Sequence, residues 1–467
     1  MYRNNEKKSH WLHLGAGAFH RAHQSWYLNQ LHQQGDERWT LSLANIRNSS
    51  TTQQTLQQLA QQQGRYTLEI ISPEGEFNYQ PITAIEKIIL WDRGLQSMIA
   101  EGADSETRII SFTVTEGGYF LNDDGHLDLT HPAIKTDLNE HQEPTTLYGA
   151  LFKILHQRML NHAGPVTLLN CDNLRNNGDS MAQGLREFVA AKNQPELLAW
   201  IELNTSAPNG MVDRITPKFD DVIYQRLAQQ GITNDLVPLS CESFSQWVLE
   251  DDFIAGRPAL ENAGVEFVSS VTPYEEAKIR VLNASHSGIA WAGALLNKQY
   301  IDQSIQPTIS QWIRNYVLQD LVPALQPTKI DLTLYCDTVL NRFSNKYVRD
   351  TCQRVSSDSI AKMYGFILPT LKASYQRGEI PQATLILPAL WFRFMQLRHR
   401  GKLPFEYQDR ALDEVPFDVI FSADDPLYAF SHEEKLFGSL AGVTLYNDLK
   451  RALESVDSGL RLMRGDA

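Results

Sequence analysis

Apolar residues in the first half of the chain come in short runs that end at glycine, proline or polar turns. Runs of this length are typical of buried strands, and helix-like patterns lie between several of them. The predicted strands are residues 11–14, 40–46, 66–72, 88–90, 108–114, 165–169 and 265–271, and the predicted helices are residues 21–31, 52–63 and 146–161. Polar residues 122–143 are predicted to form a loop. Alternating strands and helices indicate a mostly parallel sheet, hence a Rossmann-type α/β domain.

Beyond this half the apolar pattern becomes almost entirely helical. Helices are predicted at residues 306–319, 332–342, 360–376, 382–395, 432–438 and 443–455. We therefore divide the chain into a dinucleotide-binding Rossmann-type domain at residues 1–265 and a mostly α-helical substrate domain at residues 266–467.

A glycine turn follows the first predicted strand. It reads Gly15-Ala16-Gly17-Ala18-Phe19, and glycines in such a turn let backbone N–H groups approach a pyrophosphate. The third glycine of the GxGxxG fingerprint is replaced by His20, so an ordinary strand–helix turn remains the alternative. The position of the turn at the first strand–helix junction favours dinucleotide binding by residues 15–19.

Two further stretches bear on the cofactor. The second strand ends without the Asp or Glu that usually holds the ribose hydroxyls, and Arg47 follows it instead. Arg47 could contact a 2′-phosphate or the adenine, or be an ordinary surface residue, which leaves NAD against NADP open. Thr115 and Glu116 follow the strand at residues 108–114, at the sheet edge where α/β proteins bind ligands.

One long helix is predicted from residue 274 to residue 291, apolar nearly all round and therefore buried. On an α-helical wheel with Lys278 at zero, His286 falls at about 80° and Asn283 at about 140°. Three polar groups on one side of a buried helix need partners or a function. A lysine that reaches solvent and a core histidine are the structural alternatives.

Composition limits the function. The 467-residue chain carries a net charge of −13 and no basic run, which argues against nucleic acid and membrane surfaces as partners. Its four scattered cysteines form no CxxC motif, and no HExxH motif occurs, so no metal site is predicted. No apolar stretch is long enough to span a bilayer. We expect a cytoplasmic protein.

A buried Lys, two Asn and a His suit hydride transfer from an alcohol. Burial makes the lysine amine a usable base near neutral pH, which is the role expected for Lys278. Asn173, which follows a predicted strand, and Asn283 could stabilise the developing oxyanion, and His286 could orient the substrate.

Five stretches of the chain resemble one known family: GAGAFHRAHQ, TVTEGGY, NCDN, PNGMVDRITP and KIRVLNASHS. They are similar to the polyol-specific long-chain dehydrogenases, the mannitol dehydrogenase family, and extend over most of the chain. The resemblance implies a Rossmann domain with a helical domain, a nicotinamide cofactor, no metal and a monomer. It also implies oxidation of D-arabinitol at C4 to D-xylulose with NAD.

The resemblance also assigns roles to individual residues. It implies that Lys278 is the general base, that Asn173 and Asn283 form the oxyanion hole, and that His286 binds a substrate hydroxyl. The further expected contacts are Asp213, Arg354 and Lys362 to the polyol, and Gly15, Ala16, Gly17, Ala18 and Phe19 to the pyrophosphate.

Other functions stay open on the sequence. Within the family the alternatives are mannitol 2-dehydrogenase and a fructuronate or tagaturonate reductase, which would need a cation such as Arg354 or Lys362 for its carboxylate. Outside it, the alternative is a non-catalytic dinucleotide-binding regulator, which would have no need of a buried Lys, Asn and His on one helix.

Overall fold

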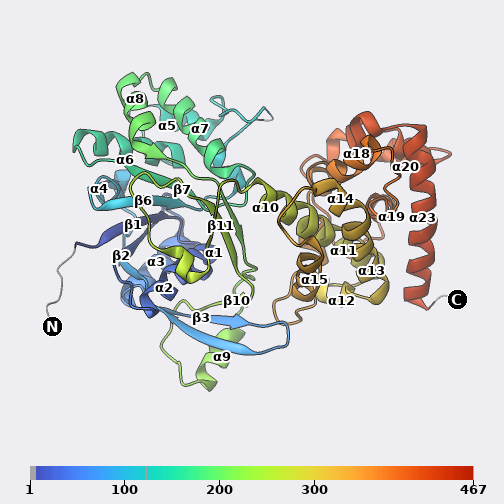
Figure 1. The fold of residues 1–467 in the computed structure, drawn as a ribbon, viewed down its shortest axis with the longest axis horizontal. Helices are drawn as coiled ribbons and strands as arrows, with labels where there is room; N and C mark the ends of the chain where they lie inside the picture. Colours follow the sequence, from blue (N-terminus) through green and yellow to red (C-terminus); the bar gives the residue numbers. More distant parts are fainter. Residues whose placement is uncertain (1–6, 123, 140, 466–467) are drawn as a thin grey trace. The chain divides into compact units, whose positions relative to one another are not determined.

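The computed structural model describes residues 7–122, 124–139 and 141–465. The chain folds into two compact units (Figure 1). The first consists of Met1–Ile71 and Phe77–Thr272, and the second of Ser72–Glu76 and Pro273–Ala467.

The first unit is built on a six-stranded sheet whose paired strands all run parallel. The strand order is β5-β2-β1-β6-β7-β8, which places β1 and β6 at the centre. Their bounds are Ser9–Leu14 for β1, Trp39–Ala44 for β2, Ile85–Ile88 for β5, Thr107–Phe112 for β6, Val166–Asn170 for β7 and Thr205–Ser206 for β8. The sheet confirms the predicted Rossmann-type α/β fold.

Helices cover both faces of this sheet because successive strand residues point to opposite sides. Trp11 of β1 belongs to one apolar core, and its neighbours Leu12 and Leu14 belong to the other. The helices are α1 (Ala18–Ala22), α2 (Gln24–Gln33), α3 (Ser50–Gln61), α4 (Gln96–Gly102), α6 (Leu147–Leu160), α7 (Asn177–Ala191) and α8 (Pro195–Asn204).

Two small sheets complete the first unit. One contains β3 (Tyr66–Ile71), β4 (Phe77–Ile82) and β10 (Leu239–Glu242), and the other contains β9 (Gly210–Asp213), β11 (Gln246–Glu250) and β12 (Glu266–Val268). Helix α9 (Val222–Gln229) also belongs to this unit.

The stretch predicted as a loop contains a short helix, α5 (Pro132–Leu138). Its proline stands in the first turn, where no N–H is needed, and His131 caps it by accepting from the Ala133 N–H. The buried Asp137 carboxylate accepts from Thr145 and Thr146. Tertiary contacts of this kind, and not periodicity, hold so short a helix.

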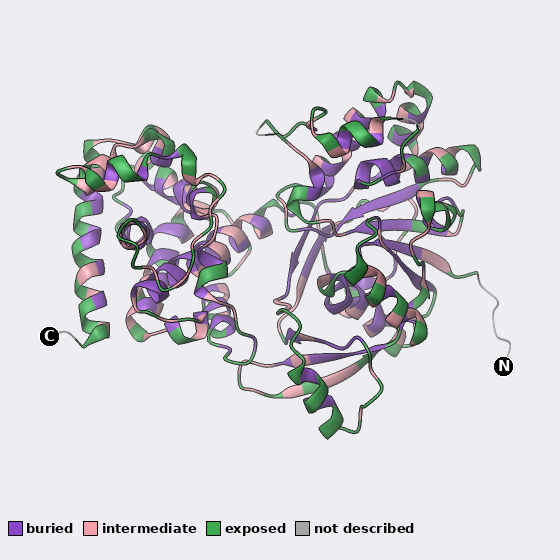
Figure 2. Ribbon diagram, turned by 180° about the vertical axis from the view of Figure 1, so that it is seen from behind, coloured by how far each residue is buried: buried purple, intermediate pink, exposed green. Residues whose placement is uncertain are grey.

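The second unit is helical, as predicted, and packs around one continuous apolar core. Its main helices are α10 (Thr272–Ala277), α11 (Ala284–Leu295), α13 (Pro307–Asn315), α15 (Leu332–Phe343), α16 (Cys352–Ser356), α17 (Ser359–Lys362), α18 (Leu368–Gln376), α19 (Ile386–His399) and α23 (Val443–Arg464). Helix α11 is buried along nearly its whole length, and α16 and α19 pack against it. Several helices of this unit are buried on one side and exposed on the other (Figure 2).

Short π-helical segments interrupt the helices of this unit: η4 (Lys278–Asn283), η5 (Tyr316–Leu321) and η6 (Met363–Ile367). Segment η4 packs against both η5 and η6. Wide turns of this kind are rare and recur at functional sites. Among the described residues no helix combines the length and apolar character needed to cross a membrane.

Candidate functional site

The glycine turn after β1 is shaped by the backbone of Gly15. Its φ of 130° lies in the region that glycine tolerates, and its N–H donates to the Ala44 carbonyl over 2.8 Å. A Cβ on Gly15 would come within 2.5 Å of the Thr113 carbonyl oxygen. Gly17 and Ala18 are exposed where α1 begins. The turn therefore presents bare backbone at the position predicted for a pyrophosphate.

His20, in the place of the third glycine, is fully buried. Its ring stacks on that of His13 with centroids 3.3 Å apart, and His13 Nδ1 lies 2.6 Å from Ser111 Oγ. Burial lowers the pKa of His13 to about 3 and that of His20 well below its ordinary value, so both rings are neutral. The two stacked imidazoles thus come from residues on either side of the turn, in which Ala16 is buried and Phe19 half-buried.

A strained turn follows β6 at the carboxyl edge of the sheet. Thr115 has a φ of 66°, which is unusual for a β-branched residue. The Asp172 carboxylate holds the turn, because it accepts from the N–H groups of Val114 at 2.8 Å and Thr115 at 3.0 Å and from the Tyr119 hydroxyl. Burial raises the pKa of Asp172, against these hydrogen bonds. Thr115 and Glu116 are exposed on this turn.

Asn177 ties two of the sequence motifs together. Its side-chain amide donates to the carbonyls of Asp172 at 3.1 Å and Gly210 at 2.8 Å, and its oxygen accepts from the Gly210 N–H at 2.9 Å. Asn173, next to Asp172, is exposed, whereas Asp213 is buried at the end of β9. Sequence reasoning missed Asn177, because a buried Asn is recognised only by the carbonyls around it.

Arg47 is exposed in the segment just after β2. Its carbonyl accepts from the Asn45 side chain over 2.6 Å, which folds residues 45–47 back on themselves. This exposure fits both a cofactor contact and an ordinary surface residue.

The predicted helix at residues 274–291 is a helix, but it is not α-helical throughout. It runs as α10, then the π-helix η4, then α11. Lys278 and Asn283 are the first and last residues of η4, and Lys278 is 7% exposed. The wider π turn brings residues five apart closer to one side than an α-helical wheel does. The α-helical wheel used for the sequence therefore does not apply across η4.

Side chains from other elements hold the π turn. The Tyr316 hydroxyl donates to the Arg280 carbonyl over 2.6 Å, and the Arg280 guanidinium donates to Thr370 Oγ1 at 3.0 and 3.1 Å. The Ser287 hydroxyl donates to the Asn283 carbonyl over 2.9 Å. The bonds from Tyr316 and Ser287 reach backbone carbonyls of η4, and the bond between Arg280 and Thr370 anchors a side chain of the same segment.

His286 lies in the first turn of α11. Its ring stacks on Phe343 with centroids 4.2 Å apart, and its Nε2 lies 3.9 Å from Asp350 Oδ2. Burial lowers the pKa of His286 to about 3, although the Asp350 charge opposes the shift. The imidazole is therefore neutral at physiological pH and can accept or donate one hydrogen bond to a hydroxyl.

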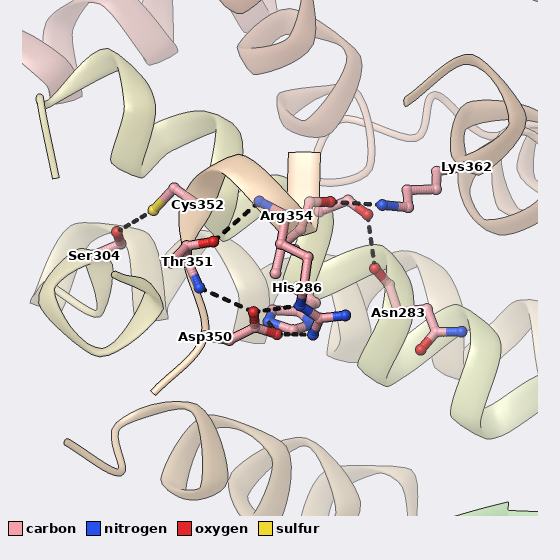
Figure 3. A network of polar contacts seen from close by, with 10 residues as sticks. Asn283, His286, Ser304, Asp350, Thr351, Cys352, Arg354 and Lys362 are labelled. Atoms are coloured by element: carbon pink, nitrogen blue, oxygen red, sulfur yellow. Dashed lines mark hydrogen bonds and ion pairs between the residues drawn. The ribbon is translucent and has the colours of Figure 1, made fainter. Parts of the chain in front are cut away.

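Arg354 and Lys362 lie in the same network as His286 (Figure 3). The Arg354 guanidinium binds Asp350 with two nitrogens: Nε donates to Oδ1 over 2.6 Å and Nη2 pairs with Oδ2. Lys362 Nζ donates to the Val355 carbonyl over 2.6 Å, and burial lowers its pKa to about 8. The structure thus brings His286, Arg354 and Lys362 together around Asp350. Sequence reasoning did not identify Asp350.

Asp350 left one signal in the sequence. It stands four residues before Arg354, the spacing of a helical ion pair. The two residues flank the start of α16, where Thr351 caps the helix by accepting from the Arg354 N–H. Phe343, by contrast, is one of several apolar residues on α15. Only the fold shows that its ring stacks on the His286 imidazole.

Within the described residues, no group of three or more His, Cys, Asp or Glu side chains could hold a metal ion. The four cysteines are buried and unbridged.

Two family models match the chain over nearly its full length. Residues 9–262 match the mannitol dehydrogenase Rossmann domain, and residues 270–457 match the mannitol dehydrogenase C-terminal domain.

Individual proteins agree with these models. The chain is 49% identical to a D-arabinitol 4-dehydrogenase of Klebsiella pneumoniae over 92% of this chain and 94% of that one. It is 48% identical to a D-arabinitol 4-dehydrogenase of Ralstonia nicotianae over 92% of both chains. The solved ternary complex of Pseudomonas fluorescens mannitol 2-dehydrogenase with NAD and D-mannitol is 31% identical, with a TM-score of 0.81 over 100% of this chain and 96% of that one.

Proposed function

Because the chain belongs to the mannitol dehydrogenase family, we propose that it is an NAD-dependent, metal-independent polyol dehydrogenase that oxidises D-arabinitol at C4 to D-xylulose. The proposed substrate rests on one observation. The chain is nearly one half identical to two D-arabinitol 4-dehydrogenases over almost the whole of each chain. The reaction is reversible.

The cofactor part of the proposal rests on the first unit. The Gly15–Phe19 turn would hold the pyrophosphate, and the backbone at Gly15 leaves no room for a side chain. Arg47, Thr115 and Glu116 are exposed at the same carboxyl edge of the sheet and would contact the rest of the dinucleotide. When bound, NAD supplies the hydride acceptor.

The proton transfer is assigned to Lys278. Oxidation of a secondary alcohol releases a hydride from carbon and a proton from oxygen, and the proton needs a base. Lys278 is buried, and burial favours the neutral amine that can accept the proton. Asn173 and Asn283 would donate hydrogen bonds to the oxygen as negative charge develops on it.

The remaining assignments concern the polyol. His286 is neutral and held by Phe343, so it can bind a hydroxyl without adding charge. Asp213, Arg354 and Lys362 would contact further hydroxyls. Arg354 is already engaged by Asp350 and Lys362 by a carbonyl, which favours an uncharged polyol over a uronate.

The test is a substrate panel. Purified protein is mixed with NAD or NADP and with D-arabinitol, L-arabinitol, D-mannitol or D-sorbitol, and the absorbance of the reduced cofactor is followed. We expect the highest kcat/KM with D-arabinitol and NAD, and NADH oxidation when D-xylulose is added. A higher kcat/KM with D-mannitol would replace the proposed substrate by the hexitol. Activity with no polyol, but with fructuronate or tagaturonate and NADH, would replace it by the uronate reductase.

A further inference from the structure

We propose that Asp350 sets the charge selectivity of the substrate site, by occupying the guanidinium of Arg354 so that the site accepts uncharged polyols and rejects sugar acids. The inference deepens the proposed function and rests on it for the location of the substrate. No role for Asp350 follows from the sequence motifs.

The pairing uses the same atoms that would recognise a carboxylate ligand. Arginine binds carboxylates through two parallel N–H groups, and on Arg354 both Nε and Nη2 are directed to Asp350. The Arg354 side chain is 64% exposed, whereas that of Asp350 is 14% exposed. A ligand can therefore reach the guanidinium, but its carboxylate would have to displace an internal one.

Asp350 is itself held in place. Its Oδ1 also accepts from the Thr351 N–H over 2.9 Å, and Thr351 caps α16, the helix that carries Arg354. Both partners of the ion pair are thus fixed by one short segment. The competing internal carboxylate is already ordered, so it binds Arg354 without the entropy loss that an incoming ligand meets.

Neither of the other two residues expected to contact the polyol here, His286 and Lys362, offers an uncommitted cation for an acid. His286, whose Nε2 is buried without a hydrogen-bond partner, is neutral. Lys362 donates to the Val355 carbonyl and is influenced by Asp358 and Asp409 as well as Asp350. A substrate carboxylate at this place would therefore be repelled by Asp350, and neither Lys362 nor His286 would be available to pair with it.

The test changes the charge of Asp350 and keeps its shape. In the NADH-bound protein, binding of D-arabinonate, which differs from D-arabinitol by one carboxylate, is measured by calorimetry for the wild type and for Asp350→Asn. We expect Kd for D-arabinonate to fall at least tenfold in Asp350→Asn, because the Arg354 guanidinium is then no longer bound by a carboxylate of the protein. Asp350→Glu, which keeps the charge, is the matched control and should bind the acid as weakly as the wild type.

A second variant shows where the acid binds. In Asp350→Asn/Arg354→Gln the tighter binding of D-arabinonate should disappear, because this variant has no guanidinium at position 354. Circular dichroism verifies that each variant is folded. If Asp350→Asn is not folded, Asp350→Ser takes its place in both measurements. An unchanged Kd in the folded variant, a gain that survives Arg354→Gln, or wild-type binding of the acid as tight as that of D-arabinitol overturns the inference.

The two proposals fail in different ways. If the wild type oxidises no polyol, the proposed function fails, whereas the calorimetric result is obtained without turnover. If the wild type oxidises D-arabinitol and Asp350→Asn shows no gain for the acid, the role of Asp350 fails alone.

Discussion

At the scale of single residues, the chemistry depends on polar side chains that the fold removes from water. Lys278, His286 and Asp350 lie on or beside one buried helical segment. Burial leaves the imidazole uncharged, and the carboxylate is bound by the Arg354 guanidinium. Residue type and order along the chain were enough to single out the Lys and His, whereas the carboxylate became visible only through its contacts.

The role proposed for Lys278 has a direct test. Lys278→Met removes the amine and keeps most of the volume, so the buried segment should stay packed. A general base contributes about 10² to 10⁴ in rate, and we expect kcat to fall by a factor in this range. Binding of NADH, followed by its fluorescence, should be unchanged. Turnover near the wild-type value would exclude Lys278 as the base.

At the scale of elements, the decisive feature is the π turn η4. The apolar pattern of residues 274–291 predicted one helix, because a segment that is apolar nearly all round carries no periodic signal that separates an α turn from a π turn. Two residues outside the turn bond to its Arg280: Tyr316 from η5 contacts the carbonyl, and Thr370 from α18 contacts the guanidinium. Local sequence therefore predicts the helix, and its neighbours decide the spacing of Lys278 and Asn283.

This dependence predicts that Tyr316 is a positioning residue. Tyr316→Phe leaves the buried Arg280 carbonyl without its partner, at a cost of about 1 to 3 kcal/mol. We expect kcat with D-arabinitol to fall about tenfold and the apparent pKa in the pH profile of kcat to shift, with KM for NAD unchanged.

Tyr375→Phe is the matched control for this variant. It also removes one hydroxyl hydrogen bond within the second unit, to Asp448 at 2.9 Å, but it does not touch η4. It should lower stability without altering the pH profile. If both variants behave alike, the effect of Tyr316 is general destabilisation and not positioning of the base.

At the scale of the whole molecule, each of the two units buries histidine that stays neutral: His13 and His20 in the first and His286 in the second. Burial depresses each folded-state pKa below the value near 6.5 of the unfolded chain. The stability that this gives is present above pH 6.5, and it is lost as pH falls, because only the unfolded state takes up the proton.

The free energy of unfolding should therefore decrease below pH 6.5, by up to about 1.4 kcal/mol per pH unit for each such histidine. Urea unfolding followed by circular dichroism between pH 7 and pH 5 measures the slope. His13→Asn/His20→Asn should be less stable at pH 7 but show a shallower slope. An equal slope in the variant would show that these two rings do not cause the acid sensitivity.

The sequence alone was sufficient for the parallel sheet, the helical second half and the family, because these depend on apolar periodicity, on glycine turns and on motifs that are local in the chain. The short helix α5 escaped prediction, since Asp137 and its contacts to residues 145–146 stabilise it and periodicity does not.

Tertiary structure alone decided three properties of the candidate site. It selected the π turn through Tyr316, joined two motifs through Asn177, and committed Arg354 to Asp350. All three are hydrogen bonds whose partners are fixed by packing or by side-chain geometry. Hydrophobic patterning records which residues are buried, but it does not record which buried polar groups meet.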